Sequence, residues 1–334
     1  MSALLGLAVA GAAATTPIGA ADLSAAAGDG WLEAVVAVGD LDARSALFRD
    51  VLGYELVHRG FVAPEQIRAW GIPEGETAHE ALLREPGARR GFIRLVAFAT
   101  GPGAGRIRSS AQPWEAGGWS GLNVRVREID AVFGRLQAAG FQGFSDPVSF
   151  SVPPFQVREA MMVGPDGLVL GLLERVAPPL AGPGWTSLAS RPVTAFSVTD
   201  RPEETEAALR RLSLAVRLSF DGPTAEPGPN LFALPHTLVG QTTRSVRWWQ
   251  ESGREEGTIA TIAFGGLSGR SFAEDARPPS LGLFTLRLPV PDAGRRCAAA
   301  GATIFTAEIA PYGRVRSCVV RLPNGAQLDL VQAD

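Results

Sequence analysis

One pattern recurs along this chain and limits the folds it can adopt more than any other feature. An apolar strand, a polar break with an acidic residue, an amphipathic helix and two or three further strands follow one another four times. Such repeats mark structural units that stack, because one unit cannot bury its own apolar face. The chain is therefore predicted to be α+β, with four βαβββ units.

The first copy shows the pattern most clearly, in WLEAVVAVGDLDARSALFRDVLGYELV from Trp31 to Val57. Its closely spaced valines favour a strand, and Asp40 is suited to cap the N-terminus of the helix that follows. Gly53 comes where that helix should end, a position that often needs a left-handed residue. HEALLREPG and GFIRLVAFATG then predict two strands joined by a turn.

The later copies begin at WSGLNVRVREIDAVFGRLQAAGF, VTAFSVTDRPEETEAALRRLSLAVRL and LGLFTLRLPVPDAGRRCAAAGATIF. The second and fourth copies end alike, in GPDGLVLGLLE and LPNGAQLDLVQ. Units one and two are therefore predicted to form one module, residues 30–177, and units three and four another, residues 192–333. The Pro- and Gly-rich stretch at 178–191 is predicted to be a linker.

Residues 1–25 are predicted to be a signal-like or disordered leader. Their apolar run and small residues resemble a secretory signal, but the positively charged start of a signal is absent. The protein is expected in the periplasm or outside the cell if the leader is a signal peptide, and in the cytoplasm otherwise. No other stretch reaches the length of a membrane span.

Charge and cysteine content narrow the remaining classes. A net charge of -3 and a pI near 5.8, with scattered cations, argue against a nucleic-acid partner. Cys297 and Cys318 form no CxxC motif, and two small core residues are the favoured interpretation. A disulfide is the alternative, which depends on the separation of their Cα atoms. Monomer and homodimer both remain open.

The phrases VAVGDLDARSALFRDVLGYELV and VGPDGLVLGLLE resemble the glyoxalase/bleomycin-resistance group, the vicinal oxygen chelate (VOC) superfamily. The resemblance extends over nearly the whole chain after the leader. It implies two modules with cupped mixed sheets and a divalent metal on four side chains from the first and last strands of paired units. His, Gln and Glu usually provide these ligands, because the metal must polarise a substrate oxygen as a Lewis acid.

The positions that should hold the metal depart from this pattern. In the first module they fall on Glu33, which is an acceptable ligand, on Arg94, which would repel a cation, and on Gly121 and Gly171. In the second module they fall near Val193, Thr261, Gly282 and Asp329. The three histidines show no metal-ligand spacing. No metal cofactor is therefore predicted, with a divalent metal as the alternative.

Strand alternation predicts which side chains line the first cup. Glu33 and Arg94 are predicted to be the catalytic pair. Residues predicted to bind substrate are Phe92, Phe98, Trp119, Asn123 and Arg125, with Asp329 in the second module. In one interpretation Glu33 and Arg94 neutralise each other; in the other, an arginine binds an oxygen of the substrate and Glu33 is a general base.

Two functions follow from these residues. The first is a metal-independent or atypical lyase or isomerase that acts on a small carbonyl- or carboxylate-bearing metabolite in the cup of module one. The alternative is a non-catalytic protein that binds a small molecule, as drug-sequestering members of the superfamily do. A charged acid–base pair that reaches a pocket favours the enzyme. A broad aromatic groove with Glu33 and Arg94 locked together favours the binding protein.

Overall fold

The computed structural model describes residues 18–101, 105–152, 154–180, 184–223, 230–251 and 257–334. The four predicted units follow one another in this order, and their strands form two mixed sheets. The α+β class predicted from the sequence is therefore confirmed.

The first half of the chain contains a short N-terminal helix and units one and two. The N-terminal helix and unit one are α1 (Ala20–Ala26), β1 (Glu33–Ala37), α2 (Leu41–Ala46), the π-helical turn η1 (Leu47–Val51), β2 (Glu55–Phe61), α3 (Pro64–Ala69), β3 (Ala78–Arg84) and β4 (Phe92–Phe98). Unit two is β5 (Gly121–Val126), α4 (Ile129–Ala138), β6 (Gln142–Gly143), β7 (Val148–Val152), β8 (Phe155–Val163) and β9 (Val169–Ala177). As predicted, Asp40 caps α2, because its side chain accepts from the Ala43 amide at 2.9 Å.

The second half repeats this order in units three and four. Unit three is β10 (Ala189–Val198), α5 (Pro202–Arg211), β11 (Ala215–Pro223), α6 (His236–Val239), β12 (Thr243–Gln250) and β13 (Thr258–Gly265). Unit four is β14 (Gly282–Pro289), α7 (Ala293–Ala299), β15 (Phe305–Ile309), β16 (Gly313–Arg321) and β17 (Gln327–Ala333). β10 begins inside the segment predicted to be a linker, so the third unit starts slightly earlier than expected.

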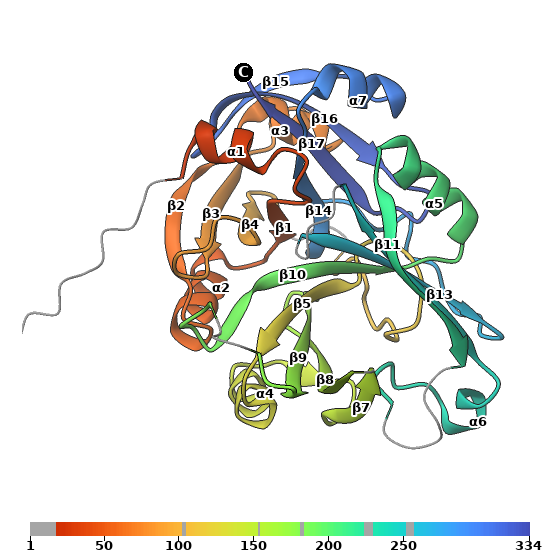
Figure 1. The fold of residues 1–334 in the computed structure, drawn as a ribbon. Helices are drawn as coiled ribbons and strands as arrows, with labels where there is room; N and C mark the ends of the chain where they lie inside the picture. Colours follow the sequence, from red (N-terminus) through yellow and green to blue (C-terminus); the bar gives the residue numbers. More distant parts are fainter. Residues whose placement is uncertain (1–17, 102–104, 153, 181–183, 224–229, 252–256) are drawn as a thin grey trace, which may run out of the picture.

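The sheets pair the first unit with the fourth and the second with the third. One sheet has the order β15-β16-β17-β14-β1-β4-β3-β2, and the other has the order β11-β12-β13-β10-β5-β9-β8-β6, with β7 beside β8 (Figure 1). We call the concave side of the first sheet cup A and that of the second sheet cup B. The expectation that consecutive units share a cup is therefore wrong. Each predicted module contributes one of its two units to cup A and the other to cup B.

A single large apolar core holds the two sheets together. α2 and α7 cover the outer face of one sheet and α4 and α5 cover that of the other. This core includes Leu95 of β4, Leu122 of β5 and Leu209 of α5. Trp119 belongs to it as well, and its indole Nε1 donates to the Gln327 carbonyl at 2.8 Å. Since side chains alternate along a strand, every second residue of each sheet points away from this core into a cup.

The packed part of the chain begins inside the predicted leader. Ile18 and Leu23, the latter in α1, are buried in an apolar cluster with Val315 of β16 and Val331 of β17. Residues 1–17 of the predicted leader lie outside the described residues. Residues 18–25, which the sequence had assigned to the leader, are therefore part of the described fold.

The two cysteines are joined. Cys297 of α7 and Cys318 of β16 form a disulfide with their Cα atoms 6.0 Å apart, a normal separation for such a bond. The favoured interpretation of two unpaired core cysteines is therefore wrong, and the alternative is confirmed. The bond fastens α7 to the sheet of cup A.

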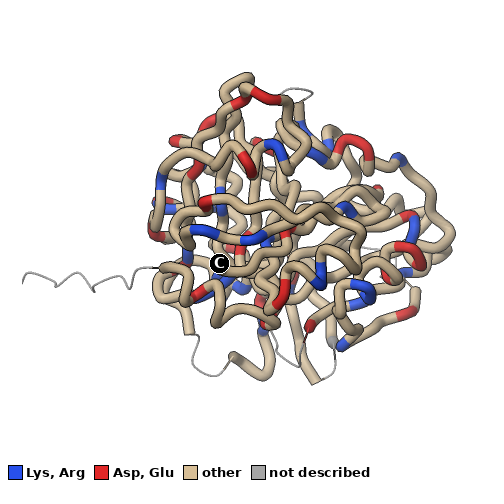
Figure 2. The backbone as a smooth tube through the Cα atoms, turned by 90° about the horizontal axis from the view of Figure 1, so that it is seen from above, with Lys and Arg blue, Asp and Glu red and all other residues tan. Residues whose placement is uncertain are grey.

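Charges of both signs are interspersed around the molecule (Figure 2). Many form pairs at the surface, such as Arg158 with Asp130 at 2.7 Å. Of the helices that the structure describes, none is long and apolar enough to cross a membrane.

Candidate functional site

Strand register defines the positions in cup A that correspond to the metal ligands implied by the sequence. In unit one these are Glu33 of β1 and Arg94 of β4. Arg94 pairs with Val35, which lies two residues after Glu33 on β1. The same offset in unit four gives Thr285 of β14 and Asp329 of β17. Thr285 therefore stands where the sequence alignment had placed Gly282. β14 also contains a register shift beside β1, which the sequence pattern does not reveal.

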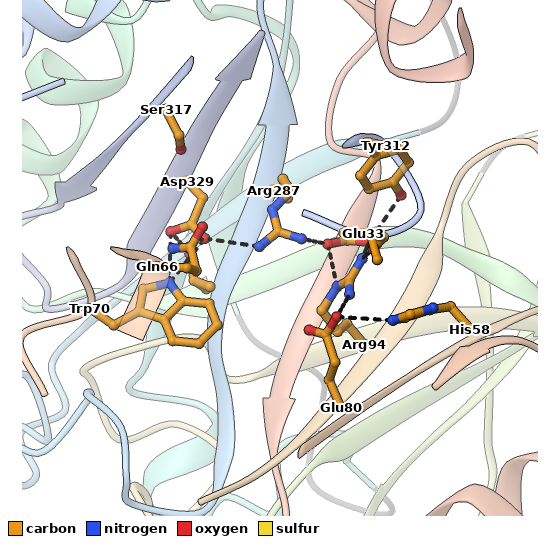
Figure 3. Close-up of polar contacts among 12 residues, drawn as sticks. Glu33, His58, Gln66, Trp70, Glu80, Arg94, Arg287, Tyr312, Ser317 and Asp329 are labelled. Carbon is orange, nitrogen blue, oxygen red and sulfur yellow. Dashed lines mark hydrogen bonds and ion pairs between the residues drawn. The ribbon is translucent and has the colours of Figure 1, made fainter. Parts of the chain in front are cut away.

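Arg94 is at the centre of a buried ionic network in cup A (Figure 3). Its Nε and one Nη donate to the two oxygens of Glu33 at 2.8 and 3.1 Å, which is a bidentate pair. Its other Nη donates to Glu80 at 2.6 Å, and the Ala310 carbonyl accepts a further bond at 2.7 Å. Tyr312 donates its hydroxyl to Glu33 at 3.0 Å. Burial raises the pKa of Tyr312 to about 12, so it remains a donor.

A second arginine joins this pair to Asp329. Arg287 of β14 donates to Glu33 and lies 3.6 Å from an oxygen of Asp329. Trp70 Nε1 and the hydroxyl of Thr285 each donate to Asp329 at 3.0 Å. Burial raises the pKa of Asp329 against the opposing attraction of Arg287, and burial lowers the pKa of Arg287. The two arginines thus provide the positive charge inside this cup.

Cup A is filled by its own side chains. Glu33, Arg94 and Asp329 are each 0% exposed. Trp70, which follows α3, packs edge-on against Phe98 at 6.5 Å, and Phe92 lies in the apolar cluster beside α1. The structure thus brings the predicted catalytic pair together on one face, but in a sealed interior. Their catalytic role stays a prediction, and this burial favours the interpretation in which the two charges neutralise each other.

The chemistry of the four positions in cup A does not suit a divalent metal. They hold two carboxylates, one hydroxyl and the guanidinium of Arg94, which already binds the Glu33 carboxylate that a metal would need. Within the described parts of the chain, no three His, Cys, Asp or Glu side chains are grouped to hold a metal ion.

Cup B has still fewer candidate ligands at the equivalent positions. Gly121 of β5 and Gly171 of β9 are the unit-two positions, as predicted. In unit three the register gives Thr194 of β10 and Ala260 of β13. Each is one residue away from the position expected from the sequence, and β10 contains a register shift next to Thr194.

The two glycines of cup B leave space that neighbouring side chains use. A Cβ atom at Gly171 would lie 2.1 Å from Oδ1 of Asn123, and one at Gly121 would lie 2.8 Å from the ring of Phe196. Asn123 and Phe196 therefore lie over the strand positions where ligands of a metal would stand. Any larger residue at Gly171 would displace Asn123.

Cup B contains a pocket of about 390 Å³. One wall is the loop between β4 and β5, which contributes Arg106, Arg108, Ser110, Ala111, Gln112 and Pro113. The rest of the lining comes from the side of the sheet, through Ser120, Gln142, Phe144, Met161, Val163, Gly167, Val169 and Phe196. Arg106 and Arg108 are the charged residues of this lining. Since Arg108 donates to the Gly117 and Glu115 carbonyls at 2.8 and 2.6 Å, it also fixes the loop.

Two charged side chains on the concave face of cup B were missed in the sequence. Glu159 of β8 alternates with Met161, a pocket residue, and Arg244 of β12 alternates with Val246 of the same apolar cluster. Burial raises the pKa of Glu159 to about 7, opposed by the attraction of Arg244. No motif marks either residue, because they come from different units and meet only across the curled sheet.

The residues predicted to bind substrate are divided by the structure. Asn123 and Arg125 of β5 lie on the concave face of cup B by strand alternation, and the Arg125 amide donates to Ser190 Oγ at 2.9 Å. Trp119 lies in the shared core, while Phe92, Phe98 and Asp329 belong to cup A. The predicted single pocket thus corresponds to residues of two different cups.

Comparison with known proteins identifies the fold. No family model matches the sequence, and no curated protein matches it either. Among solved structures, the chain is similar to glyoxalase I from Zea mays, with a TM-score of 0.57 and 13% identity, covering 91% of this chain and 92% of that one. It is also similar to a candidate dioxygenase from Bacillus subtilis, with a TM-score of 0.55 and 14% identity, covering 92% and 86%. The chain therefore has the glyoxalase-type, or vicinal oxygen chelate, fold in its tandem four-unit form, which confirms the fold that the resemblance in its sequence implies.

Proposed function

We propose that this protein binds a small, largely apolar organic molecule in cup B, while cup A serves the stability of the fold. The observation that carries the proposal is the pocket of about 390 Å³ over the apolar face of cup B. Pockets for small molecules typically have such volumes, with apolar walls and few polar groups. The sealed pair of Glu33 and Arg94 also supports the non-catalytic alternative drawn from the sequence.

A metal-independent lyase or isomerase is the second candidate, and Glu159 is the observation that favours it. A carboxyl group whose pKa is raised to about 7 can take up and release a proton near neutral pH. On this candidate the chemistry would take place in cup B on a carbonyl- or carboxylate-bearing molecule. Glu33 and Arg94 would then stabilise the fold and take no part in the reaction.

The proposal is tested by filling the pocket. Naphthalene-2-carboxamide, a neutral bicyclic probe, should show saturable one-to-one binding in a fluorescence titration. Val163→Trp should weaken this binding by about tenfold or more, because the indole would occupy the pocket. Val176→Trp, on an exposed site of β9, is the matched control and should leave binding unchanged. Equal binding by Val163→Trp and the wild type would place the ligand elsewhere.

Binding and catalysis are separated by following the fate of candidate molecules. Carbonyl and carboxylate compounds that raise the melting temperature should be recovered unchanged after long incubation if the protein only binds them. Turnover that disappears in Glu159→Gln, with binding retained, would instead support the lyase or isomerase.

A further inference from the structure

The polar groups of cup B show what kind of molecule the pocket can recognise. The pocket lining contains two arginines, Arg106 and Arg108, and neither Asp nor Glu. Arg244 adds another guanidinium on the same concave face, on which Arg125 also lies by strand alternation. Glu159 is the acidic group facing them, and burial holds much of it in the neutral acid form near pH 7. The cup is therefore positively charged inside, which favours an anionic guest.

Arg244 is held in a fixed position for such a guest. Its guanidinium lies over the rings of Phe220 and Phe232, 5.3 and 5.2 Å from their centroids. Phe232 is held in turn by an edge-on contact with Phe264 at 5.2 Å. The loop that carries Phe232 is closed by Asn230, whose side-chain oxygen accepts from the Leu234 amide at 2.6 Å. A stacked guanidinium keeps its in-plane N–H groups directed to the side, where a carboxylate can accept them.

Among the described residues, neither Arg244 nor Glu159 forms a hydrogen bond or ion pair with another side chain. The Nε atom of Arg244 is buried and has no hydrogen-bond partner among the described residues. The carboxyl group of Glu159 likewise makes no hydrogen bond or ion pair within the described chain, and its cross-strand neighbours, Val148 and Leu173, are apolar. In cup A, by contrast, Arg94 binds Glu33, Glu80 and a carbonyl. A buried polar group without a partner is costly, so a ligand that accepts a hydrogen bond from Nε of Arg244 would be stabilised.

We propose that cup B selects small apolar molecules that carry a carboxylate, whose oxygens accept hydrogen bonds from the guanidinium of Arg244 and the carboxylic acid of Glu159. The apolar body of the guest would lie against Met161 and Phe196, which line the pocket. This inference rests on the proposed binding function and adds the chemical class of the ligand. Naphthalene-2-carboxylate has this combination of a flat apolar body and one anionic group.

The test compares three probes of one shape at pH 6, below the raised pKa of Glu159. Naphthalene-2-carboxylate should bind at least about tenfold more tightly than naphthalene-2-carboxamide, since hydrogen bonds to charged groups are the stronger ones. (2-Naphthyl)methylammonium should bind more weakly than the amide. If the amide binds but the carboxylate gains nothing, the inference fails and the proposed function stands. If none of the three binds, both fail.

Variants of Arg244 test whether this residue causes the preference for the carboxylate over the amide. Arg244→Met should remove the tenfold advantage of the carboxylate while the amide still binds. Arg244→Lys should recover part of it, because the charge is kept and the planar fork is lost. Arg247→Met is the matched control: Arg247 is on the same strand but on the opposite face, 2.9 Å from Asp221, and its loss should not change the preference. An unchanged preference in a folded Arg244→Met or Arg244→Lys protein would overturn the assignment.

Glu159 gives an independent readout. Arg244 from β12 is the charged group that acts on it, so raising the pH from 6 to 8.5 places a carboxylate beside the bound anion. The affinity of the wild type for naphthalene-2-carboxylate should fall over this range. In Glu159→Gln, which keeps a neutral hydrogen-bond donor, the affinity should stay nearly constant. A parallel fall in both proteins would remove Glu159 from the site.

Discussion

Cup A and cup B share a strand order and an antiparallel joint between two units, but their concave faces differ in chemistry. In cup A, Glu33, Arg94, Arg287 and Asp329 are buried and bonded to one another. In cup B the equivalent positions hold small residues, and a pocket remains that is lined by apolar side chains and a few polar ones. Charge that is fully compensated inside the protein stabilises one fold, whereas charge without a partner is available to a ligand. The difference separates a cup used for packing from a cup able to bind.

The largest expected effect comes from breaking the network of cup A. Arg94→Met would leave Glu33 and Glu80 with reduced compensation in a dry interior, which should lower the free energy of unfolding by about 3–5 kcal/mol. Urea unfolding monitored by circular dichroism measures this change. Arg158→Met removes a half-exposed partner of Asp130 and is the control, with an expected loss below about 1 kcal/mol. Similar losses of unfolding free energy in the two variants would mean that the buried network stabilises the fold no more than a surface ion pair does.

The disulfide should come next in size. Replacing both Cys297 and Cys318 by alanine removes a cross-link across a separation of 21 residues, and the expected loss is about 2–4 kcal/mol. A reducing agent should destabilise the wild type by a similar amount and leave the double variant unaffected. Since disulfides persist in oxidising compartments, an effect on the wild type would also support the exported alternative for localisation. If the reductant leaves the free energy of unfolding of the wild type unchanged, the disulfide does not stabilise cup A.

Glu159 should make the stability of cup B depend on pH. Burial raises its pKa in the folded state from 4.5 to about 7, so the folded chain keeps a proton that the unfolded chain releases between these values. The free energy of unfolding should therefore fall as pH rises through this window, by at most about 3 kcal/mol. Glu159→Gln should lack this component when urea unfolding is compared at pH 4.5 and pH 8. An identical pH dependence in both proteins would contradict the raised pKa.

Divalent metal should have the smallest effect, in either cup. A metal present at 100 times its dissociation constant would add about 2.7 kcal/mol to stability if a site existed. Because neither set of positions offers suitable ligands, Zn²⁺ and Ni²⁺ should leave the melting temperature unchanged. Metal analysis of the purified protein is the direct check. Stoichiometric bound metal would contradict the conclusion that neither cup has suitable ligands, and it would support a metalloenzyme instead.

The sequence was sufficient for the units but not for their pairing. Strand and helix periodicity located β1, α2, α4, α5 and α7, and the PDG and PNG turns marked the last strands of units two and four. Which unit pairs with which depends on hydrogen bonds between residues more than 250 positions apart, such as Glu33 beside Arg287. Local patterns carry no such information, so the assumption that neighbours in sequence share a sheet led to the wrong partners.

The candidate site shows the same limit at the level of single residues. Alternation correctly placed Glu33 and Arg94 on one face, because that relation is local to two adjacent strands. It did not show that Tyr312 and Trp70 would close the cup over them, since these residues come from a distant turn and a short helix. Glu159 and Arg244 were missed for the same reason.

The crossed pairing of units has a consequence for synthesis. The strands of unit one leave the ribosome first, yet their partner β14 follows roughly 250 residues later, as the separation of 254 between Glu33 and Arg287 shows. At about 5–20 residues per second, β1 waits on the order of tens of seconds with an unpaired edge. Units two and three are adjacent and can close their sheet in the meantime. The first-made quarter of the protein should thus be the last to become protease-resistant, an order that proteolysis of stalled nascent chains can measure.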